Sequence, residues 1–475
     1  MGTTVFERMR PDPSVVNHAL AATRQSPFWI EDAPADSYAV LTADTHCDLA
    51  VVGGGYSGLW TALLAKRRNP SARVMLLEAR RIGWAASGRN GGFCESSLTH
   101  GDENGLSRFP DEFERLQELG QANLDDIERT IGELGLDCDF ERNGAIDIAT
   151  EPYQVDWLRE AANGVDALFL DTDAVRAQVN SPTFEAGLFR IRDSALIHPA
   201  KLTRALAGAC AELGVELHEH TPVTRLDTAG LSVADGAELR TPRATVRARK
   251  VALATNVFPS LLKRNRFATV PVYDYVLMTE PLTDSQLASI GWKGRQGLGD
   301  SANQFHYYRL SRDNRILWGG YDAIYHYGGR VRDEYEDRPR TFRRLASHFF
   351  TTFPQLEGIR FTHKWAGAID TCSRFCAFFG SARDGRVAYA AGFTGLGVAS
   401  THFGAQVMLD LLEGSPTERT ELAMVKSRPL PFPPEPAASI GINLTRRALD
   451  RADHDGGRRN LYLKTLDAVG LGFDS

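Results

Sequence analysis

The stretch Asp48-Leu49-Ala50-Val51-Val52-Gly53-Gly54-Gly55-Tyr56-Ser57-Gly58 decides the fold of this chain, because an apolar strand runs into a G-x-G-x-x-G turn. In such a turn Gly53 lets the strand bend sharply and Gly55 lets the backbone approach a pyrophosphate. Gly58 allows close packing of the next helix on the strand. We expect that helix over residues 59–68, with its N-terminal N–H groups directed at the phosphates. The stretch therefore predicts a dinucleotide-binding βαβ unit, with Tyr56 and Ser57 in the turn before its helix.

A second predicted strand, residues 72–77, ends at Glu78, twenty residues beyond Gly58. A carboxylate at this place can accept hydrogen bonds from both hydroxyls of a ribose. A glycine triad alone also arises by chance in loops. Strand, helix, second strand and acid in register argue for the dinucleotide site.

The segment after the acid indicates which dinucleotide is bound. It reads Ala79-Arg80-Arg81-Ile82-Gly83-Trp84-Ala85-Ala86-Ser87-Gly88-Arg89-Asn90-Gly91-Gly92. A nicotinamide domain usually continues from the acid into another helix and strand, whereas this segment is a loop of small residues. Backbone without bulky side chains suits the diphosphate, ribityl chain and ring edge of a flavin.

These residues resemble the FAD-binding signature of the D-amino-acid-oxidase-like flavoprotein superfamily, most closely its gamma-glutamylputrescine oxidase branch, which carries an R-I-G-x-x-A-S-G-R-N-G-G run. The resemblance extends over about residues 20–435. Further stretches carry it: His198-Pro199, which opens a helix in that family; Tyr307-Tyr308-Arg309-Leu310 with Asp313-Asn314-Arg315, which resembles its hairpin with a turn at residues 312–315; Trp365-Ala366-Gly367; and Gly392-Phe393-Thr394-Gly395-Leu396-Gly397-Val398 with Thr401-His402.

The resemblance implies a non-covalently bound FAD. Val223 is expected to contact the adenine through its backbone, and the turn 392–397 to direct N–H dipoles at the reduced ring. Arg89 and Asn90 are expected to contact the cofactor or to support its loop. The predicted FAD-binding residues are Gly53, Gly55, Tyr56, Ser57, Gly58, Glu78, Ala79, Arg80, Ala86, Ser87, Gly88, Arg89, Asn90, Gly91, Gly92, Val223, Ala254, Thr255, Gly367, Gly392, Gly395, Leu396 and Gly397.

Aromatic residues are expected to line the substrate cavity, since an aromatic box suits an amine through cation–π attraction and apolar walls. A packed sheet core is the alternative for each of them. The predicted substrate-binding residues are Phe93, Cys94, Tyr307, Trp318, Trp365 and Phe375. His306 is a candidate base for the substrate ammonium and Tyr308 a second candidate catalytic group, although a lone histidine on a strand is more often structural.

The predicted fold is mixed α/β, with a discontinuous Rossmann-like FAD-binding domain and an inserted antiparallel-sheet substrate domain. A flexible N-terminal extension, anchored at Ser26-Pro27-Phe28-Trp29, covers residues 1–45. FAD-binding segments are expected at 46–105, 195–265 and 370–415, and substrate-domain segments at 106–194 and 266–369, the last with a helix over about residues 334–353. A tail with an amphipathic helix follows at 416–475.

Composition excludes several classes of protein. A net charge of −6 and a pI near 6.1 argue against a nucleic-acid partner. The N-terminus has no apolar core of a signal peptide, and the uncharged stretch 49–65 contains glycines, polar residues and the dinucleotide motif, which argue against a membrane span. We therefore expect a cytoplasmic protein with no membrane partner. The six cysteines form no zinc motif, so we expect free thiols and no metal.

The sequence thus predicts an enzyme that oxidises a C–N bond of a small amine or amino acid. Hydride passes to flavin N5, the imine hydrolyses, and O2 reoxidises the flavin with formation of H2O2. Related sarcosine oxidases carry lysines near the ring where this sequence has Trp318 and Ala399. One alternative is therefore a dehydrogenase that passes electrons to a quinone or another carrier. A flavin-stabilised binding protein without turnover is an alternative of another class.

Overall fold

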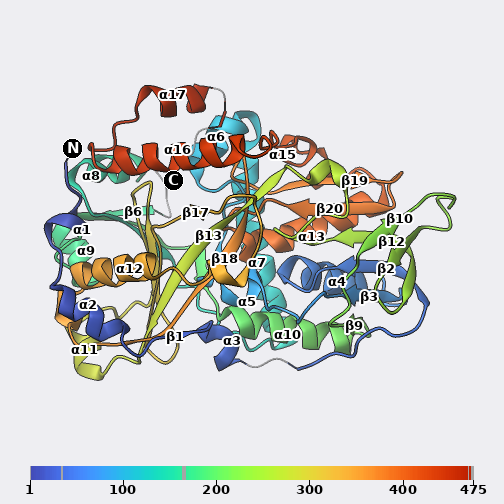
Figure 1. Ribbon diagram of the computed structural model, residues 1–475, viewed down its shortest axis with the longest axis horizontal. Coiled ribbons are helices and arrows are strands. Elements are labelled where there is room, and N and C mark those ends of the chain that lie inside the picture. Colours follow the sequence, from blue (N-terminus) through green and yellow to red (C-terminus); the bar gives the residue numbers. More distant parts are fainter. Residues whose placement is uncertain (1, 34–35, 163–166, 469, 472–475) are drawn as a thin grey trace.

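The computed structural model describes residues 2–33, 36–162, 167–468 and 470–471. Two large sheets lie side by side along the longest axis of the molecule, as Figure 1 shows, and helices cover both. Parallel strands dominate one sheet and antiparallel strands the other. The mixed α/β architecture predicted from the sequence is confirmed.

The first sheet has eight strands, in the order β10-β11-β12-β2-β3-β9, with β20 pairing β12 and β19 pairing β20. β12, β2, β3 and β9 run parallel, as a βαβ unit requires. The strands are β2 (Thr45–Val52), β3 (Val74–Leu77), β9 (Glu216–His218), β10 (Arg225–Asp227), β11 (Ala237–Arg240), β12 (Thr245–Leu253), β19 (Phe378–Ala382) and β20 (Val387–Ala391). Three separate stretches of chain therefore build this sheet, and they fall within the stretches 46–105, 195–265 and 370–415 apart from the first residue of β2.

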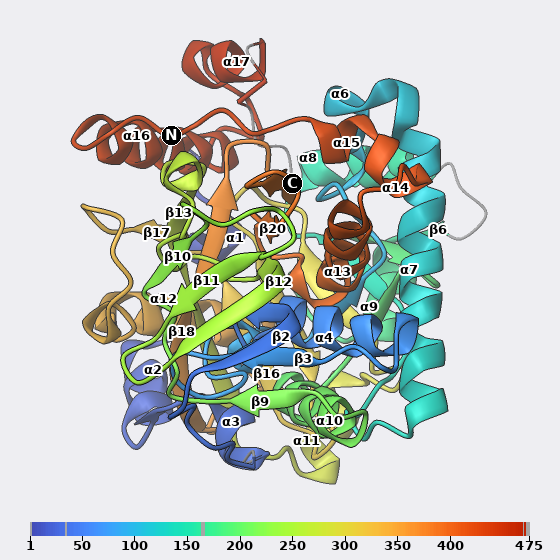
Figure 2. The same cartoon turned by 90° about the vertical axis from the view of Figure 1, so that its right-hand side faces the viewer.

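Helices α4 (Tyr56–Arg68), α10 (Pro199–Glu212) and α13 (Gly397–Glu413) pack together on the first sheet around a common apolar core. α10 begins where the sequence predicts, because Pro199 occupies its first position and His198 accepts the Lys201 N–H at 3.2 Å. α7 (Phe113–Leu134) lies against α13 and ends at Gly135, whose φ of 60° is left-handed. Figure 2 shows α7 along the edge of the molecule, next to α4 and α13.

The second sheet has ten strands, in the order β1-β18-β13-β16-β15-β14-β5-β7-β6, with β17 pairing β13. The strands are β1 (Arg24–Gln25), β5 (Ala145–Ala149), β6 (Ala167–Leu170), β7 (Ala186–Arg190), β13 (Thr269–Thr279), β14 (Gly297–Asp300), β15 (His306–Leu310), β16 (Ile316–Gly320), β17 (Ile324–Tyr325) and β18 (Phe361–Cys372). β15 and β16 form the hairpin expected around residues 312–315.

Helix α12 (Pro339–Thr352) covers one face of the second sheet and shares an apolar core with it. We expected this helix to begin near residue 334, but Pro339 is its first position and residues 333–335 form a separate 3₁₀ turn. A proline is favoured at the first position of a helix, which sets this boundary. Smaller helices complete this half: α8 (Pro152–Ala161), α9 (Thr172–Gln178) and α11 (Asp284–Ile290).

The N-terminal extension is ordered where we expected flexibility. It forms α1 (Val5–Arg8), α2 (Pro13–Leu20), β1 and α3 (Phe28–Asp32), and β1 adds a parallel strand to β18. Trp29 is 1% exposed, and its indole N–H donates to the Asn90 carbonyl at 3.0 Å. Trp29 of the predicted anchor is therefore part of the core, and the backbone pairing of β1 with β18 attaches the neighbouring residues to the second sheet.

Short elements join the two halves, and a helical tail crosses them both. The joining elements are α5 (Ala86–Arg89), α6 (Asp102–Arg108) and the pair β4 (Phe93–Glu95) and β8 (Ser194–Leu196). The tail contains α14 (Glu418–Glu421), α15 (Ala423–Lys426), α16 (Ala437–Asp453) and α17 (Leu461–Ala468), and α16 lies across the top in Figure 1. Among the helices of the described residues, none is long and apolar enough to cross a membrane.

Candidate functional site

A cavity of about 3160 Å³ lies between the two sheets. Val52 and Leu77, at the carboxyl ends of β2 and β3, line one side, and Val272, Gly299 and Tyr307 of the second sheet line the other. Ligand sites in open parallel sheets occur at this end of the strands. Typical small-molecule pockets measure ~300–1000 Å³, so this cavity has room for a dinucleotide and a substrate together.

The glycine turn forms the floor below one end of the cavity. Gly53 has a φ of 114°, and a Cβ there lies 2.4 Å from the Ala254 carbonyl oxygen. A Cβ at Gly58 lies 1.9 Å from the Gly53 carbonyl oxygen, so the helix packs against the turn as predicted. α4 starts here, and its Tyr56 N–H donates to Ser87 Oγ at 2.9 Å. The helix N-terminus and its dipole thus face the cavity wall.

Glu78 lies at the end of β3 in the same wall, and its carboxylate has protein donors of its own. It accepts the N–H groups of Gly54 and Arg80, each at 2.7 Å, and the Trp84 indole N–H at 3.1 Å. An ionised carboxylate offers about four acceptor positions. The acid therefore braces the glycine turn as well as facing the cavity, a role that the sequence did not indicate.

The loop 79–92 is held from both sides by the body of the protein. Asn90 donates to the carbonyls of Ala86 and Ser87 and accepts the Gly92 N–H at 2.8 Å. Trp365 and Trp29 donate to the carbonyls of Arg89 and Asn90. These contacts make the Arg89–Asn90 peptide a rigid part of the cavity wall.

Arg89 is bound to protein groups, although we expected it to contact the cofactor or support its loop. Its guanidinium donates to the Trp84 carbonyl at 2.8 Å, to the Ala366 carbonyl at 3.1 Å and to Glu336 at 2.8 Å. These contacts indicate that Arg89 supports the loop, because they attach it to β18.

The glycine-rich turn before α13 forms another part of the wall. The Gly392 N–H donates to Asp370 Oδ2 at 2.6 Å, and Gly395 has a φ of 94°. Burial raises the pKa of Asp370 to about 7, and the backbone N–H groups of the turn oppose that rise. A Cβ at Gly397 has no protein atom closer than 3.8 Å. The protein therefore leaves space at the start of α13 that faces the cavity.

Most of the predicted FAD-binding residues line the cavity. Three do not: Gly58 packs on Gly53, Gly88 on the Gly83 carbonyl, and Gly392 on Phe378. The lining residues are Gly53, Gly55, Tyr56, Ser57, Glu78, Ala79, Arg80, Ala86, Ser87, Arg89, Asn90, Gly91, Gly92, Val223, Ala254, Thr255, Gly367, Gly395, Leu396 and Gly397.

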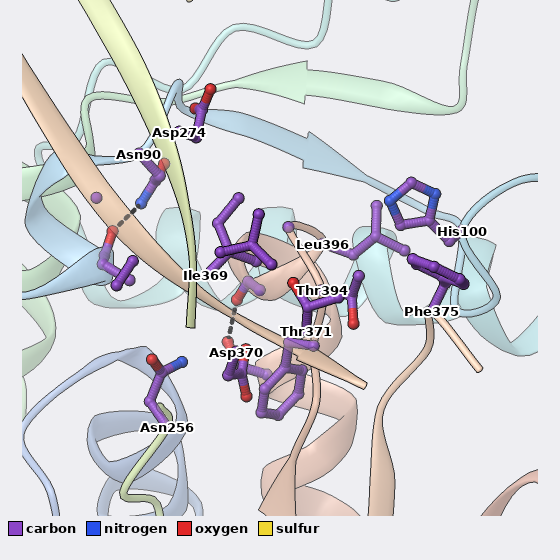
Figure 3. Close-up of a pocket in the computed structure, with 18 of the residues that line it drawn as sticks. Asn90, His100, Asn256, Asp274, Ile369, Asp370, Thr371, Phe375, Thr394 and Leu396 are labelled. Carbon is purple, nitrogen blue, oxygen red and sulfur yellow. Dashed lines mark hydrogen bonds between the residues drawn. The ribbon is translucent and has the colours of Figure 1, made fainter. Parts of the chain in front are cut away.

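Three of the predicted substrate residues, Phe93, Tyr307 and Phe375, line the cavity. Figure 3 shows Phe375 with Asn90, Asp274, Asp370 and Leu396 among the wall residues. Tyr307 and Phe93 meet edge to face with ring centroids 5.8 Å apart.

The other predicted substrate and catalytic residues lie outside the cavity. His306, Tyr308 and Trp318 are fully buried on the opposite face of the β15–β16 hairpin from Tyr307, under α12. His306 bonds Asp300 at 2.5 Å and His348 at 3.0 Å. Strand alternation explains this placement, because neighbouring residues face opposite sides. These three side chains are core residues, and a catalytic role for His306 and Tyr308 is not retained.

Cys94 and Trp365 were predicted to line the substrate cavity, and the structure places both outside it for different reasons. Cys94 is fully buried because β4 directs Phe93 and Glu95 into the cavity and Cys94 into the core. Trp365 lies opposite Val276, on the sheet face that also carries Asp274, but Trp29 and the Arg89 carbonyl cover it.

Acids of the cavity wall that the sequence analysis did not single out include Asp274 and Glu95. Asp274 lies in the middle of β13 and accepts the Tyr307 hydroxyl, and burial raises its pKa to about 6. Glu95 also lines the cavity, and burial raises its pKa to about 7. The available signal for Asp274 was a single charge within the apolar strand 269–279.

Comparison with known proteins identifies the family. The family described as DAO, FAD dependent oxidoreductase, matches residues 48–411, and the chain belongs to it. Gamma-glutamylputrescine oxidoreductase of Escherichia coli is 30% identical over 84% of this chain and 92% of its own length. A probable oxidoreductase, OrdL, of Haemophilus influenzae is 28% identical over 79% of this chain and 84% of its own length.

Solved structures share the fold at lower identity. Glycine oxidase from Geobacillus kaustophilus superposes with a TM-score of 0.65 at 20% identity, covering 78% of this chain and 96% of its own. L-Proline dehydrogenase from P. horikoshii superposes with a TM-score of 0.64 at 17% identity, covering 80% and 96%. The chain is thus an FAD-dependent oxidoreductase with the fold expected from its sequence.

The cavity fits FAD on structural grounds of its own. Ser57 Oγ at the start of α4 and Asn256 Oδ1 after β12 are buried in residues that line the cavity, and neither has a hydrogen-bond partner in the described part of the chain. Buried polar atoms are normally hydrogen-bonded, so these two call for a polar ligand. The phosphates and hydroxyls of the dinucleotide supply such partners. The space around Gly397, where a Cβ would lie 3.8 Å from Phe393 and Thr401, leaves room beside the start of α13.

Proposed function

We propose that this enzyme oxidises a C–N bond of a small amine or amino acid and that O2 is the final electron acceptor. The observation that carries the proposal is the wall beside the loop 89–92, where the carboxyl group of Asp274, the hydroxyl of Tyr307 and the ring of Phe93 lie together on one cavity. An acid among aromatic rings suits a nitrogen cation. The name of the Escherichia coli relative, an oxidoreductase of an amine, supports the same substrate class.

When bound, FAD supplies the acceptor for the hydride that leaves the carbon next to the substrate nitrogen. The amine becomes an imine, and water hydrolyses it to a carbonyl compound and ammonia or a smaller amine. The residues of this chain bind the nitrogen between aromatic walls and hold the loop 89–92 rigid. The N-terminus of α13 directs its dipole at the cavity, which favours negative charge there.

We also propose that FAD is bound without a covalent bond to cysteine. All six cysteines are buried, and none of them lines the cavity in the described residues. Acid precipitation tests this directly. We expect free FAD in the supernatant, and a flavin that stays with the denatured protein contradicts the proposal.

The function is tested by mixing the purified enzyme anaerobically with amines, acylated polyamines, aminophosphonates and amino acids, and following the flavin absorbance. Bleaching by at least one compound is expected. The reduced enzyme is then mixed with O2 in a stopped-flow instrument. Fast reoxidation with formation of H2O2 supports an oxidase, whereas slow reoxidation indicates a dehydrogenase that uses a quinone or another carrier. A flavin that no compound bleaches favours a binding protein without turnover.

A further inference from the structure

Asp274 is a carboxylate in the cavity wall without a protein counter-charge. It lies between Val272 and Val276 on the cavity face of β13, and its hydrogen-bonded side-chain partner is the neutral Tyr307 hydroxyl. No arginine or lysine among the described residues forms an ion pair with it or contributes to its pKa shift. A buried charge without a counter-charge is unfavourable, so this position calls for a cation from outside the protein.

Two other acids of the cavity wall differ from Asp274 because each has a counter-charge within the protein. Glu336 pairs with Arg89 at 2.8 Å, and Asp147 pairs with Arg190 at 3.0 Å. Asp370 is bound by backbone donors of the turn before α13, among them the Gly392 N–H at 2.6 Å. These contacts give the other acids a structural role.

Tyr307 connects Asp274 to the loop that holds the cofactor. Its ring lies against Gly91, where a Cβ falls 2.6 Å from a ring carbon, and it meets Phe93 edge to face. Burial and the adjacent carboxylate raise the pKa of Tyr307 well above its ordinary value, so the phenol stays protonated and donates to Asp274. The pair thus combines one acceptor for a nitrogen cation with two aromatic walls.

The arginines beside the pair are already bound to protein groups. Arg89 holds the Trp84 and Ala366 carbonyls and Glu336. Arg309 is 2% exposed, donates to the carbonyls of Gly92 and Ile197, and does not line the cavity. A substrate carboxylate at this place meets the Asp274 charge without a cation to offset it.

We propose that Asp274 and Tyr307 bind the substrate nitrogen, and that the site takes amines without a carboxylate on the reacting carbon in preference to α-amino acids. This inference rests on the proposed function and names the substrate class within it. Asp274 binds the ammonium through a charge-assisted hydrogen bond, and Tyr307 fixes the orientation of the carboxylate.

The pair also accounts for the proton that the reaction has to remove. Transfer of hydride requires the neutral amine, whereas an amine in water is an ammonium ion. Burial favours the uncharged forms of both partners. A proton can therefore pass from nitrogen to Asp274, breaking an N–H bond and forming an O–H bond, which leaves a neutral amine beside a neutral acid.

The binding test uses tert-butylamine, which cannot be oxidised because the carbon bonded to nitrogen carries no hydrogen. Pivalate is its anionic counterpart of similar shape. Titration of the FAD-loaded enzyme with each compound, followed by calorimetry and by the flavin spectrum, should show binding of the amine and none of pivalate. Asp274→Asn should weaken amine binding by ~10–100-fold, since a hydrogen bond to a charged group is lost. Tyr307→Phe should weaken it less.

Asp333→Asn is the matched control, because this variant removes the same charge from an exposed carboxylate at the margin of the cavity. It should bind tert-butylamine like the parent. FAD content and thermal unfolding establish that each variant is folded. If Asp274→Asn fails to fold, the comparison of tert-butylamine with pivalate on the parent enzyme still tests the proposal. Preference for pivalate, or unchanged amine affinity in a folded Asp274→Asn variant, overturns the proposal.

A second measurement separates this inference from the proposed function. Amino acids of both configurations and the amines formed by their decarboxylation are compared as reductants of the flavin. If no compound bleaches it, the proposed function fails, whatever tert-butylamine does. If amino acids reduce the flavin and the matched amines do not, the function stands and the assignment of the Asp274–Tyr307 pair is wrong.

Discussion

Replacing Gly58 by alanine tests whether close packing of α4 on the glycine turn positions the cofactor. A Cβ at Gly58 falls 1.9 Å from the Gly53 carbonyl oxygen and 3.3 Å from Val51 Cγ1. The start of α4 has to retreat by ~1 Å to reach even the 3.0 Å that real Cβ atoms respect. The obstacle is backbone, which cannot rotate away as a side chain can.

Two effects of this shift can be estimated. Overpacking of this kind usually costs ~1–3 kcal/mol of stability. The same shift moves the N-terminal N–H groups of α4 away from the pyrophosphate. A hydrogen bond to a charged group contributes ~1.5–3 kcal/mol, so losing one lowers the affinity for FAD by ~10–150-fold. We therefore expect Gly58→Ala to lose most of its FAD on dialysis.

Gly208→Ala is the matched control. Gly208 lies inside α10, and a Cβ there meets no atom within 4 Å. Such a change should raise stability by ~0.4–1 kcal/mol and leave FAD bound. The measurements are the ratio of flavin to protein after dialysis, the Kd of FAD for the apoprotein, and Tm with and without FAD. A Gly58→Ala protein with parental FAD affinity and parental Tm would refute the packing argument.

Three further predictions concern the same cavity. Glu78→Ala should lower FAD affinity at least ~10-fold and also lower the Tm of the apoprotein, because the acid holds the Gly54 and Arg80 N–H groups; a normal apoprotein Tm would argue against this bracing role. Gly397→Val should slow single-turnover flavin reduction by ~10²–10³-fold at saturating FAD, although no protein atom lies within 3.8 Å of a Cβ there; an unchanged rate would make this turn structural only. Binding of tert-butylamine should weaken as the pH falls through about 6, where Asp274 becomes protonated, since the amine itself stays charged. Glu95 and Asp370, whose pKa burial raises to about 7, and Glu336, whose pKa burial also raises, lie in the same wall, so the test compares two proteins. Asp274→Asn should lose less affinity than the parent over this range, and identical pH profiles of the two would contradict the assignment.

Features that depend on neighbouring residues in the chain could be predicted. The turn 53–58, the acid at 78 and the helix start at Pro199 each follow from local backbone requirements, and all three occur where the sequence places them. The family resemblance also predicted that separate stretches of the chain build each of the two sheets. The sequence did not reveal that the N-terminal extension is ordered, because its stability comes from β1 pairing with β18, far away in the chain.

The prediction of substrate-binding residues depended on which face of each strand adjoins the cavity. The alternation of Tyr307 with His306 and Tyr308 is visible in the sequence, but α12 covers the face of the two neighbours and the cavity adjoins the other. Period-two patterning is the same for both faces. The same reason separates Phe93 and Glu95 from Cys94.

The sequence by itself determined the dinucleotide-binding unit, because a phosphate-binding turn needs its glycines and its acid at fixed short spacings, and the family resemblance added the family and FAD. Only the tertiary structure decided which groups adjoin the cavity. Asp274 and Tyr307 are thirty-three positions apart and come together through the pairing of β13, β16 and β15. Whether a carboxylate binds a ligand or a protein partner depends on which charges fold against it, as the ion pair of Glu336 and the unpaired Asp274 show. That is a property of contacts between distant segments, and no local pattern records it.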